Sequence, residues 1–219
     1  MIDIRCAKIE NCRQQPGLYG KMIALKQKLG ERTNGNFSAG MCSKWRTAAM
    51  AVHRGLLQDS ARNGLEFALS LFTSKACTEK QELYLDAFTD YFEQLNAEGW
   101  QFVCGGKLIS WEGLHDSVRL TGQSPWIMER CGEYQCHFVT ESPVPGWQYQ
   151  LKYPLLQQYI ATHILDCNPQ QVAVGLYSIA DRQFILQQYN EQQLQDSVRE
   201  AKAIFHDMHH AFEKELHSI

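Results

Sequence analysis

The hydrophobic pattern of this 219-residue chain changes at Gly99, and that change restricts its possible folds more than any other feature. Before Gly99, apolar residues recur at three- and four-residue spacing, as at Leu85, Phe88, Phe92 and Leu95, which is typical of helices with one buried face. After Gly99, short segments rich in β-branched and aromatic residues alternate with turns. The sequence therefore predicts a mainly helical part over residues 1–98, and a sheet with helices over residues 99–219.

Individual elements follow from the same patterns. Helices are expected over residues 16–36, 37–58, 61–73, 79–97, 148–166 and 191–216. Strands are expected over residues 100–104 and 107–111 as a hairpin joined at Gly105-Gly106, then over 115–122, 125–129, 134–140, 171–179 and 182–189, with 125–129 and 134–140 antiparallel neighbours. One mixed sheet with helices on both faces is the simplest architecture for this order, in a single α/β (α+β) domain over residues 1–219.

Composition excludes several classes of protein. Hydrophobic residues make up 44% of the chain and charged residues 21%, which is typical of a globular protein. No apolar run reaches the roughly 18–20 residues needed to cross a bilayer, and the N-terminus lacks the apolar core of a signal peptide, so we expect a cytoplasmic protein without a membrane partner. The eight cysteines form no CxxC pair, which favours reduced, packed thiols over a structural zinc site.

Positive charge is concentrated near the N-terminus. Residues 1–63 contain eleven Lys and Arg residues against four acids, a net charge of +7, while the whole chain carries −3. Such asymmetry is typical of a face that binds phosphates or an acidic partner, although a solvated helical surface has the same pattern. The candidates for nucleic-acid binding are Lys44, Arg46 and Arg54. Arg46 and Arg54 are eight residues apart and share one side of a helix, whereas Lys44 lies about 160° from Arg46.

The order of elements resembles the RecB-type branch of the PD-(D/E)xK nuclease superfamily, which includes CRISPR-associated exonucleases. In that family one strand carries Gly-x-x-Asp, the next carries Asp/Glu-x-Lys-Thr, and a helix with Gln and Tyr follows. Residues 122–128 and 136–141 resemble these two strands, and 42–46 resemble the family's early Cys-Pro-Arg stretch. The residues that match the motifs are Gly122, Thr140 and Tyr159. The resemblance spans about residues 37–215 and implies a restriction-endonuclease-like fold with a mixed central sheet flanked by helices.

The catalytic positions of the family are substituted in this chain. Pro125 stands where the family has its metal-binding Asp, His137 stands at the second acid, and Val139 stands at the lysine. Proline and valine cannot coordinate Mg²⁺, and imidazole is a poor ligand for it. The sequence therefore predicts no catalytic residue, metal site or cofactor on this alignment. The resemblance implies a non-catalytic nucleic-acid-binding or assembly subunit in defence or mobile-element DNA processing, with DNA, RNA or a larger protein complex as partner.

Two alternative functions remain open. An active Mg²⁺-dependent DNA nuclease could use relocated ligands, because residues 113–116 also read Gly-x-x-Asp. Its candidates are Asp116, with Glu129, Glu133 or Glu141 as second acid and Lys107 or Lys152 as the lysine. The other alternative is a protein–protein interaction subunit that makes no contact with nucleic acid.

Two further patterns bear on function. His206 and His210 are four residues apart, a spacing that allows two imidazoles on one helix to share a metal, although a solvent-facing helix side is the favoured interpretation. Aromatic residues Trp126, Trp147, Tyr149 and Tyr153 could stack on bases if they are exposed, and a place in the core is favoured.

Overall fold

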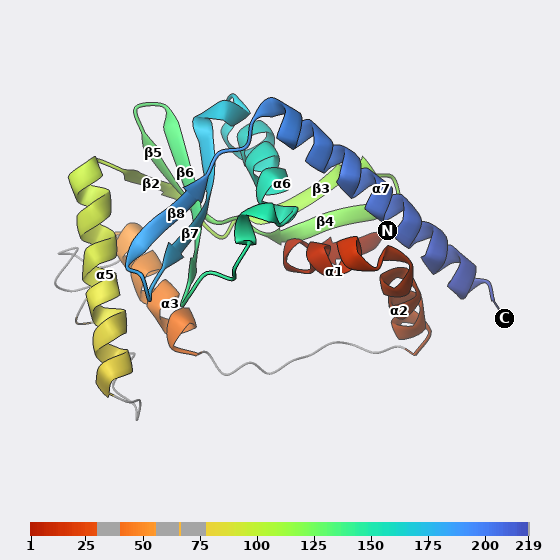
Figure 1. The fold of residues 1–219 in the computed structure, drawn as a ribbon, viewed down its shortest axis with the longest axis horizontal. Coiled ribbons are helices and arrows are strands. Elements are labelled where there is room, and N and C mark those ends of the chain that lie inside the picture. The colour runs from red at the N-terminus through yellow and green to blue at the C-terminus, as the bar shows by residue number, and fades with distance from the viewer. Residues whose placement is uncertain (30–39, 56–65, 67–77, 219) are drawn as a thin grey trace.

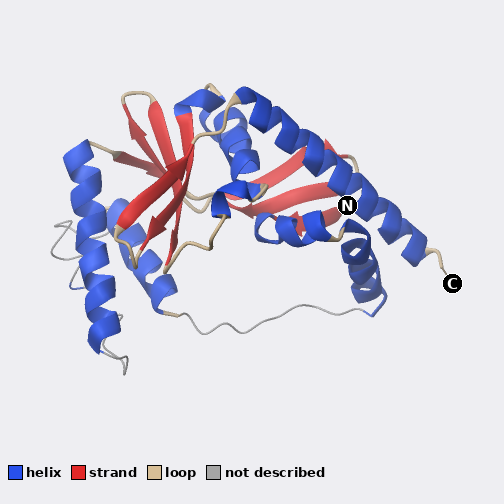
Figure 2. Cartoon of the chain, viewed as in Figure 1, coloured by secondary structure: helices blue, strands red, loops and turns tan. Residues whose placement is uncertain are grey.

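The computed structural model describes residues 1–29, 40–55, 66 and 78–218. The helix expected over 61–73, apart from residue 66, the C-terminal part of the one expected over 16–36 and both ends of the one expected over 37–58 lie outside these residues. Within them the fold is mixed α+β, as the sequence predicts, but it contains two sheets instead of one (Figure 1, Figure 2).

The larger sheet has the strand order β2-β5-β6-β7-β8. Its strands are β2 (Gln101–Cys104), β5 (Trp126–Arg130), β6 (Glu133–Thr140), β7 (Val172–Ser178) and β8 (Gln183–Gln187). The predicted antiparallel pairing of β5 with β6 is confirmed, with Trp126 opposite His137. β6 and β7 are parallel, and the chain between them passes through a helix, as a parallel connection requires.

The smaller sheet has the order β1-β4-β3, formed by β1 (Ile2–Arg5), β4 (Val118–Gln123) and β3 (Leu108–His115). The predicted hairpin at Gly105-Gly106 is wrong, because β2 pairs with β5 whereas β3 pairs with β4. The two glycines instead carry the chain from one sheet to the other. Gly106 has a φ of 69°, and a Cβ on Gly105 would lie 2.5 Å from the Trp126 ring, so the backbone passes directly against that side chain.

Most of the helices lie within the expected ranges, but the first helix was not predicted and the helix expected over 148–166 begins only at Lys152. They are α1 (Ile9–Gln14), α2 (Pro16–Leu29), α3 (Met41–His53), α5 (Thr78–Glu98), α6 (Lys152–Tyr159), which continues as a π-helical segment Ile160–Leu165, and α7 (Glu191–Leu216). Pro154 is tolerated because it lies in the first turn of α6. The backbone N–H that proline lacks would have no hydrogen-bond partner within the helix at that position. A capping box formed by Asn190 and Gln193 starts α7.

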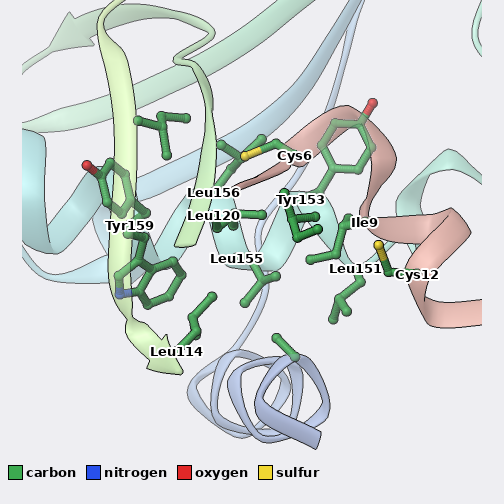
Figure 3. Packing of buried hydrophobic residues seen from close by; sticks show 14 of the residues in the cluster. Cys6, Ile9, Cys12, Leu114, Leu120, Leu151, Tyr153, Leu155, Leu156 and Tyr159 are labelled. Atoms are coloured by element: carbon green, nitrogen blue, oxygen red, sulfur yellow. The ribbon is translucent and has the colours of Figure 1, made fainter. Parts of the chain in front are cut away.

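Two hydrophobic cores lie on the two sides of the larger sheet. In one, α3 and α5 cover the sheet through Trp45, whose ring stacks on Trp126 and Tyr177 at centroid distances of 6.2 and 5.8 Å. In the other, α6 packs between the smaller sheet and the N-terminal residues, as Leu120, Leu155 and Ile9 illustrate (Figure 3).

The aromatic residues near the hairpin fall mostly into these cores. Trp126, Trp147 and Tyr153 are buried, as predicted, whereas Tyr149 is 77% exposed. None of the helices in the described ranges has the length and apolar character needed to span a membrane.

Candidate nucleic-acid interface

A cavity of about 710 Å³ opens between α3 and the ends of β5 and β6 that lie near Trp126 and Val139. One wall is a single face of α3, made by Ser43, Arg46, Thr47, Met50 and Ala51, and it continues at Arg54, which directly follows the helix. The opposite wall is made by Gly105, Gly106, residues 123–126 and residues 137–139. The cavity therefore brings Pro125, His137 and Val139, the three substituted motif positions, together with Arg46 and Arg54.

Strand geometry explains this convergence. Trp126 pairs with His137, which places Pro125 beside the end of β6. His137 and Val139 are two residues apart, so their side chains point to the same face of the sheet, the face that α3 covers. The thiol of Cys42 donates to the carbonyl oxygen of Val139 at 3.8 Å and fixes the start of α3 there.

The cavity is positively charged. Arg46 and Arg54 are exposed, and neither forms an ion pair with a residue that the structure describes. No Asp or Glu is among the described lining residues. Lys44 does not line the cavity, in agreement with the helical spacing that separates it from Arg46. Two guanidinium groups that have no carboxylate partner among the described residues, beside a concave surface, favour the binding of an anion.

His137 is fully buried and belongs to a chain of three hydrogen-bonded side chains. Its Nε2 lies 3.0 Å from the hydroxyl of Tyr91, and that hydroxyl lies 2.8 Å from Nε2 of His53. Because the hydroxyl has one proton, it donates to one imidazole and accepts from the other. Burial lowers the pKa of His137 to about 3 and that of His53 to about 4. Both rings are therefore neutral at pH 7, and His137 supports the wall of the cavity as a neutral, hydrogen-bonded side chain.

The carboxylates proposed for a relocated nuclease site do not converge. Asp116 lies in the turn between β3 and β4, in the smaller sheet. Glu129 accepts a hydrogen bond from the backbone N–H of Gly132 at 2.8 Å, near the turn of the β5–β6 hairpin. Glu141, at the other end of β6, pairs with Lys80 at 2.7 Å and accepts from the Tyr84 hydroxyl at 2.8 Å.

The remaining nuclease candidates do not join these carboxylates. Glu133 lies 3.5 Å from Arg130, and Lys152 lines a different cavity. The described residues contain no group of three His, Cys, Asp or Glu side chains placed to hold a metal.

The residues that match the nuclease motifs have structural contacts outside the cavity. Gly122 lies so close to Cys6 that an added Cβ would be 3.2 Å from the Cys6 sulfur. The hydroxyl of Thr140 donates to the carbonyl oxygen of Ser142 at 3.0 Å. The hydroxyl of Tyr159 accepts from the backbone N–H of Ser110 at 3.1 Å. The Tyr159 ring is buried in the core that α6 forms with the smaller sheet.

The C-terminal histidines are arranged differently from the predicted pair. His206 and His209 lie beside His115 of β3, at ring-centroid distances of 6.3 and 5.2 Å, while His210 is exposed. Nδ1 of His115 accepts from the backbone N–H of Ser117 at 3.1 Å, which places the proton of the neutral ring on Nε2. In this tautomer Nε2 carries the proton and has no free lone pair for a metal.

Sequence patterns did not reveal two parts of the site. The His53–Tyr91–His137 chain joins α3, α5 and β6, and no sequence spacing relates these elements. Gln123 and Gly105 line the cavity because the chain passes from one sheet to the other there, and the prediction of a hairpin did not include this crossing.

No protein-family model matches the sequence, and neither the curated proteins nor the solved structures contain a significant match.

Proposed function

We propose that this chain is a non-catalytic, nuclease-like protein that binds nucleic acid through the cavity beside α3. The observation that carries the proposal is the position of Arg46 and Arg54, which face Pro125, His137 and Val139 across a cavity without a described acidic lining residue. Arginine recognises phosphate through paired N–H donors, and its affinity for phosphate does not require a metal.

The order of elements supports a nuclease-like core. β5 and β6 form an antiparallel pair, α6 leads to β7 parallel to β6, and β8 and α7 follow, which is the order that the resemblance implies. The smaller sheet is then an addition to that core, because β1 precedes it and β3 and β4 are inserted between β2 and β5. The cellular setting, defence or mobile-element DNA processing, rests on the resemblance alone.

The absence of catalysis in this proposal follows from the chemistry of the lining residues. Hydrolysis of a phosphodiester by a Mg²⁺-dependent nuclease requires oxygen ligands beside the scissile phosphate. Pro125 and Val139 have no such ligand, and the neutral imidazole of His137 is engaged with Tyr91. A nucleic acid bound in this cavity is therefore held without being cleaved.

The test is fluorescence anisotropy with single- and double-stranded DNA and RNA over a range of salt concentrations, with and without Mg²⁺ or Mn²⁺. We expect binding without cleavage, and an affinity that decreases steeply as salt rises, because phosphate pairing releases counterions. The double variant Arg46→Ala, Arg54→Ala should weaken binding and reduce the slope of log K against log salt by about 1.4–1.8, since each phosphate contributes about 0.7–0.9.

A matched control removes two other positive charges. Arg199 and Lys202 are exposed on α7 and line neither this cavity nor its neighbour. The Arg199→Ala, Lys202→Ala variant should bind nucleic acid as the unmodified protein does. Cleavage in the presence of a divalent metal would overturn the non-catalytic proposal, and lack of binding at low salt would remove nucleic acid as the ligand.

A separate observation favours the role of an assembly subunit as the second candidate function. Leu18, Met22 and Leu25 of α2 are 56%, 40% and 46% exposed, at the spacing of one helix face. An apolar stripe of this kind is typical of a protein contact. For this role we expect complex formation that the Met22→Glu substitution abolishes and the Arg46→Ala, Arg54→Ala substitutions leave unchanged, as measured by sedimentation velocity.

A further inference from the structure

A second cavity, of about 590 Å³, adjoins the one beside α3. The two cavities share Gln123 and Phe138 as lining residues. The other lining residues of the second cavity come from the N-terminus, the smaller sheet and α6, namely Arg5, Cys6, Ala7, Leu108, Thr121, Gly122, Lys152 and Leu156. Cys6 and Leu156 lie next to each other in the core beneath it (Figure 3). The two hollows are therefore neighbours that meet at Gln123 and Phe138.

The second cavity also contains two cations and no described acidic lining residue. Arg5 is exposed at the end of β1 and forms no ion pair with a described residue. Lys152 is half-buried, its ammonium nitrogen lies 4.7 Å from the centre of the Tyr153 ring, and burial lowers its pKa. The charge of Glu10 attracts Lys152 at longer range. The Glu10 carboxylate itself accepts a hydrogen bond from the backbone N–H of Leu151 and pairs with Arg13 at 3.6 Å.

Flat or apolar side chains line the junction of the two cavities and the second cavity itself. Phe138 is half-buried at the junction, and Leu108 is 77% exposed at the edge of the second cavity. Cationic groups that follow a backbone, together with aromatic and apolar surfaces against which bases stack, are the features that bind single strands. A duplex keeps its bases paired inside two backbones, so it cannot place them in such cavities.

We propose that the two cavities form one groove for a single strand of nucleic acid, in which Arg5 and Lys152 provide a second phosphate-binding subsite contributed by the N-terminal strand and α6. This inference rests on the proposed function, since it extends the same binding site. One part of the strand lies beside Arg46 and Arg54, its bases cross the junction at Phe138, and the next phosphates reach Arg5 and Lys152.

The experiment measures the affinity of the full chain for oligothymidylates of roughly 2 to 20 nucleotides, a range that includes the usual site sizes of single-strand binding folds. We expect affinity to rise with length until both subsites are filled and then to level off. In the Arg5→Gln, Lys152→Met variant it should level off at a shorter length, and the salt slope for long oligonucleotides should decrease by about 1.4. The Arg199→Ala, Lys202→Ala variant should behave as the unmodified protein, and circular dichroism checks the fold of each variant.

Three outcomes separate the two proposals. If the Arg46→Ala, Arg54→Ala variant binds weakly while Arg5→Gln, Lys152→Met keeps the original length dependence, the second subsite is wrong and the proposed function stands. If duplex DNA of equal length binds as tightly as the single strand, the assignment to single strands is wrong. If no oligonucleotide binds at low salt, the proposed function fails, and this inference fails with it.

Discussion

The two ends of the β5–β6 hairpin differ in chemistry although they belong to the same pair of strands. At the turn, Glu129 accepts a hydrogen bond from the N–H of Gly132, and Arg130 lies 3.5 Å from Glu133 and over the Trp100 ring at 4.4 Å. Cys131 and Gly132 both have positive φ, as a two-residue hairpin turn requires. At the other end, the residues that face the cavity are Pro125, Trp126, His137 and Val139, and none of them is ionised at pH 7.

This difference shows that position within the hairpin decides what a carboxylate can do. Glu129 is three residues from Trp126, which is about 10 Å along a strand. It stabilises the turn and cannot reach the cavity that Trp126 lines. A nuclease active site would need its acids in the cavity beside Arg46, and there the described lining residues of the hairpin are all neutral.

The largest effect that we predict is from placing an acid at the cavity end. His137→Asp should lower the free energy of unfolding by about 4 kcal/mol, because a carboxylate at a fully buried position would lack a charged partner. Mg²⁺ should not restore the loss, since Pro125 and Val139 offer no second ligand. The measurement is urea unfolding with and without Mg²⁺, with Glu129→Asp as the matched change at the turn. Recovery of stability by Mg²⁺ would mean that the cavity end can bind a metal. The proposed contrast between the two ends of the hairpin would then be wrong.

The second effect is a loss of stability in acid that originates at the cavity end. The folded-state pKa values of His137 and His53, about 3 and about 4, lie below the ordinary value of 6.5. Between pH 6.5 and 4 the unfolded chain therefore binds protons that the folded protein does not, and stability falls as pH falls. The lowered pKa of His137 alone should reduce the free energy of unfolding by about 3 kcal/mol at pH 4 relative to pH 7. Urea unfolding from pH 7 to pH 4 checks this, and a His137→Gln variant with the same pH dependence would contradict it.

A smaller effect should follow from removing the hydroxyl that joins the two histidines. Tyr91→Phe leaves Nε2 of His53 and Nε2 of His137 without their shared partner and should cost about 2 kcal/mol. Tyr177→Phe is the matched control, because that buried hydroxyl makes one hydrogen bond, to the carbonyl oxygen of Ala87 at 2.7 Å, and should cost about 1 kcal/mol. Thermal unfolding measures both. Equal losses would show that the hydroxyl of Tyr91 supports one of the two rings at most.

The smallest effect is expected at the turn. Glu129→Gln keeps an oxygen acceptor for the N–H of Gly132 but removes the charge that strengthens this bond, so it should cost about 0.5 kcal/mol. Nucleic-acid affinity should not change, because Glu129 lies outside the cavity. A change in affinity comparable with that of Arg46→Ala, Arg54→Ala would show that the two ends of the hairpin act on the same ligand.

Local patterns predicted the elements well and their assembly less well. The stripe in residues 79–97, the β5–β6 pair and the last helix depend on nearby residues, and each is confirmed. The prediction of a single sheet was wrong because Gly105-Gly106 has the sequence of a hairpin turn. In the structure these glycines instead lead from one sheet to the other, and the backbone there passes against the distant Trp126. β1 was not expected, since a four-residue parallel strand is defined by its distant partner β4.

In the candidate site, too, local patterns predicted some features, whereas others depend on contacts between distant residues. The positions of Arg46 and Arg54 on one helix face follow from helical periodicity, and both line the cavity. The place of Pro125, His137 and Val139 in that cavity follows from the strand register. Arg5 and Lys152 are far apart in sequence, and only the packing of the N-terminus against α6 brings them into one cavity.

β1 and α2 have partners that are distant in sequence, and this affects how the protein folds. β1 pairs with β4, and α2 packs on α7 so closely that a Cβ on Gly20 would lie 2.2 Å from the carbonyl oxygen of Met208. The edge of β1 therefore stays unpaired until β4 is available, and the apolar face of α2 stays uncovered until α7 is available. Contacts this distant in sequence slow folding, because the whole intervening chain must be closed into a loop first. Until these distant contacts form, β1 and α2 present unpaired or apolar surface, and chaperones and aggregation compete for it.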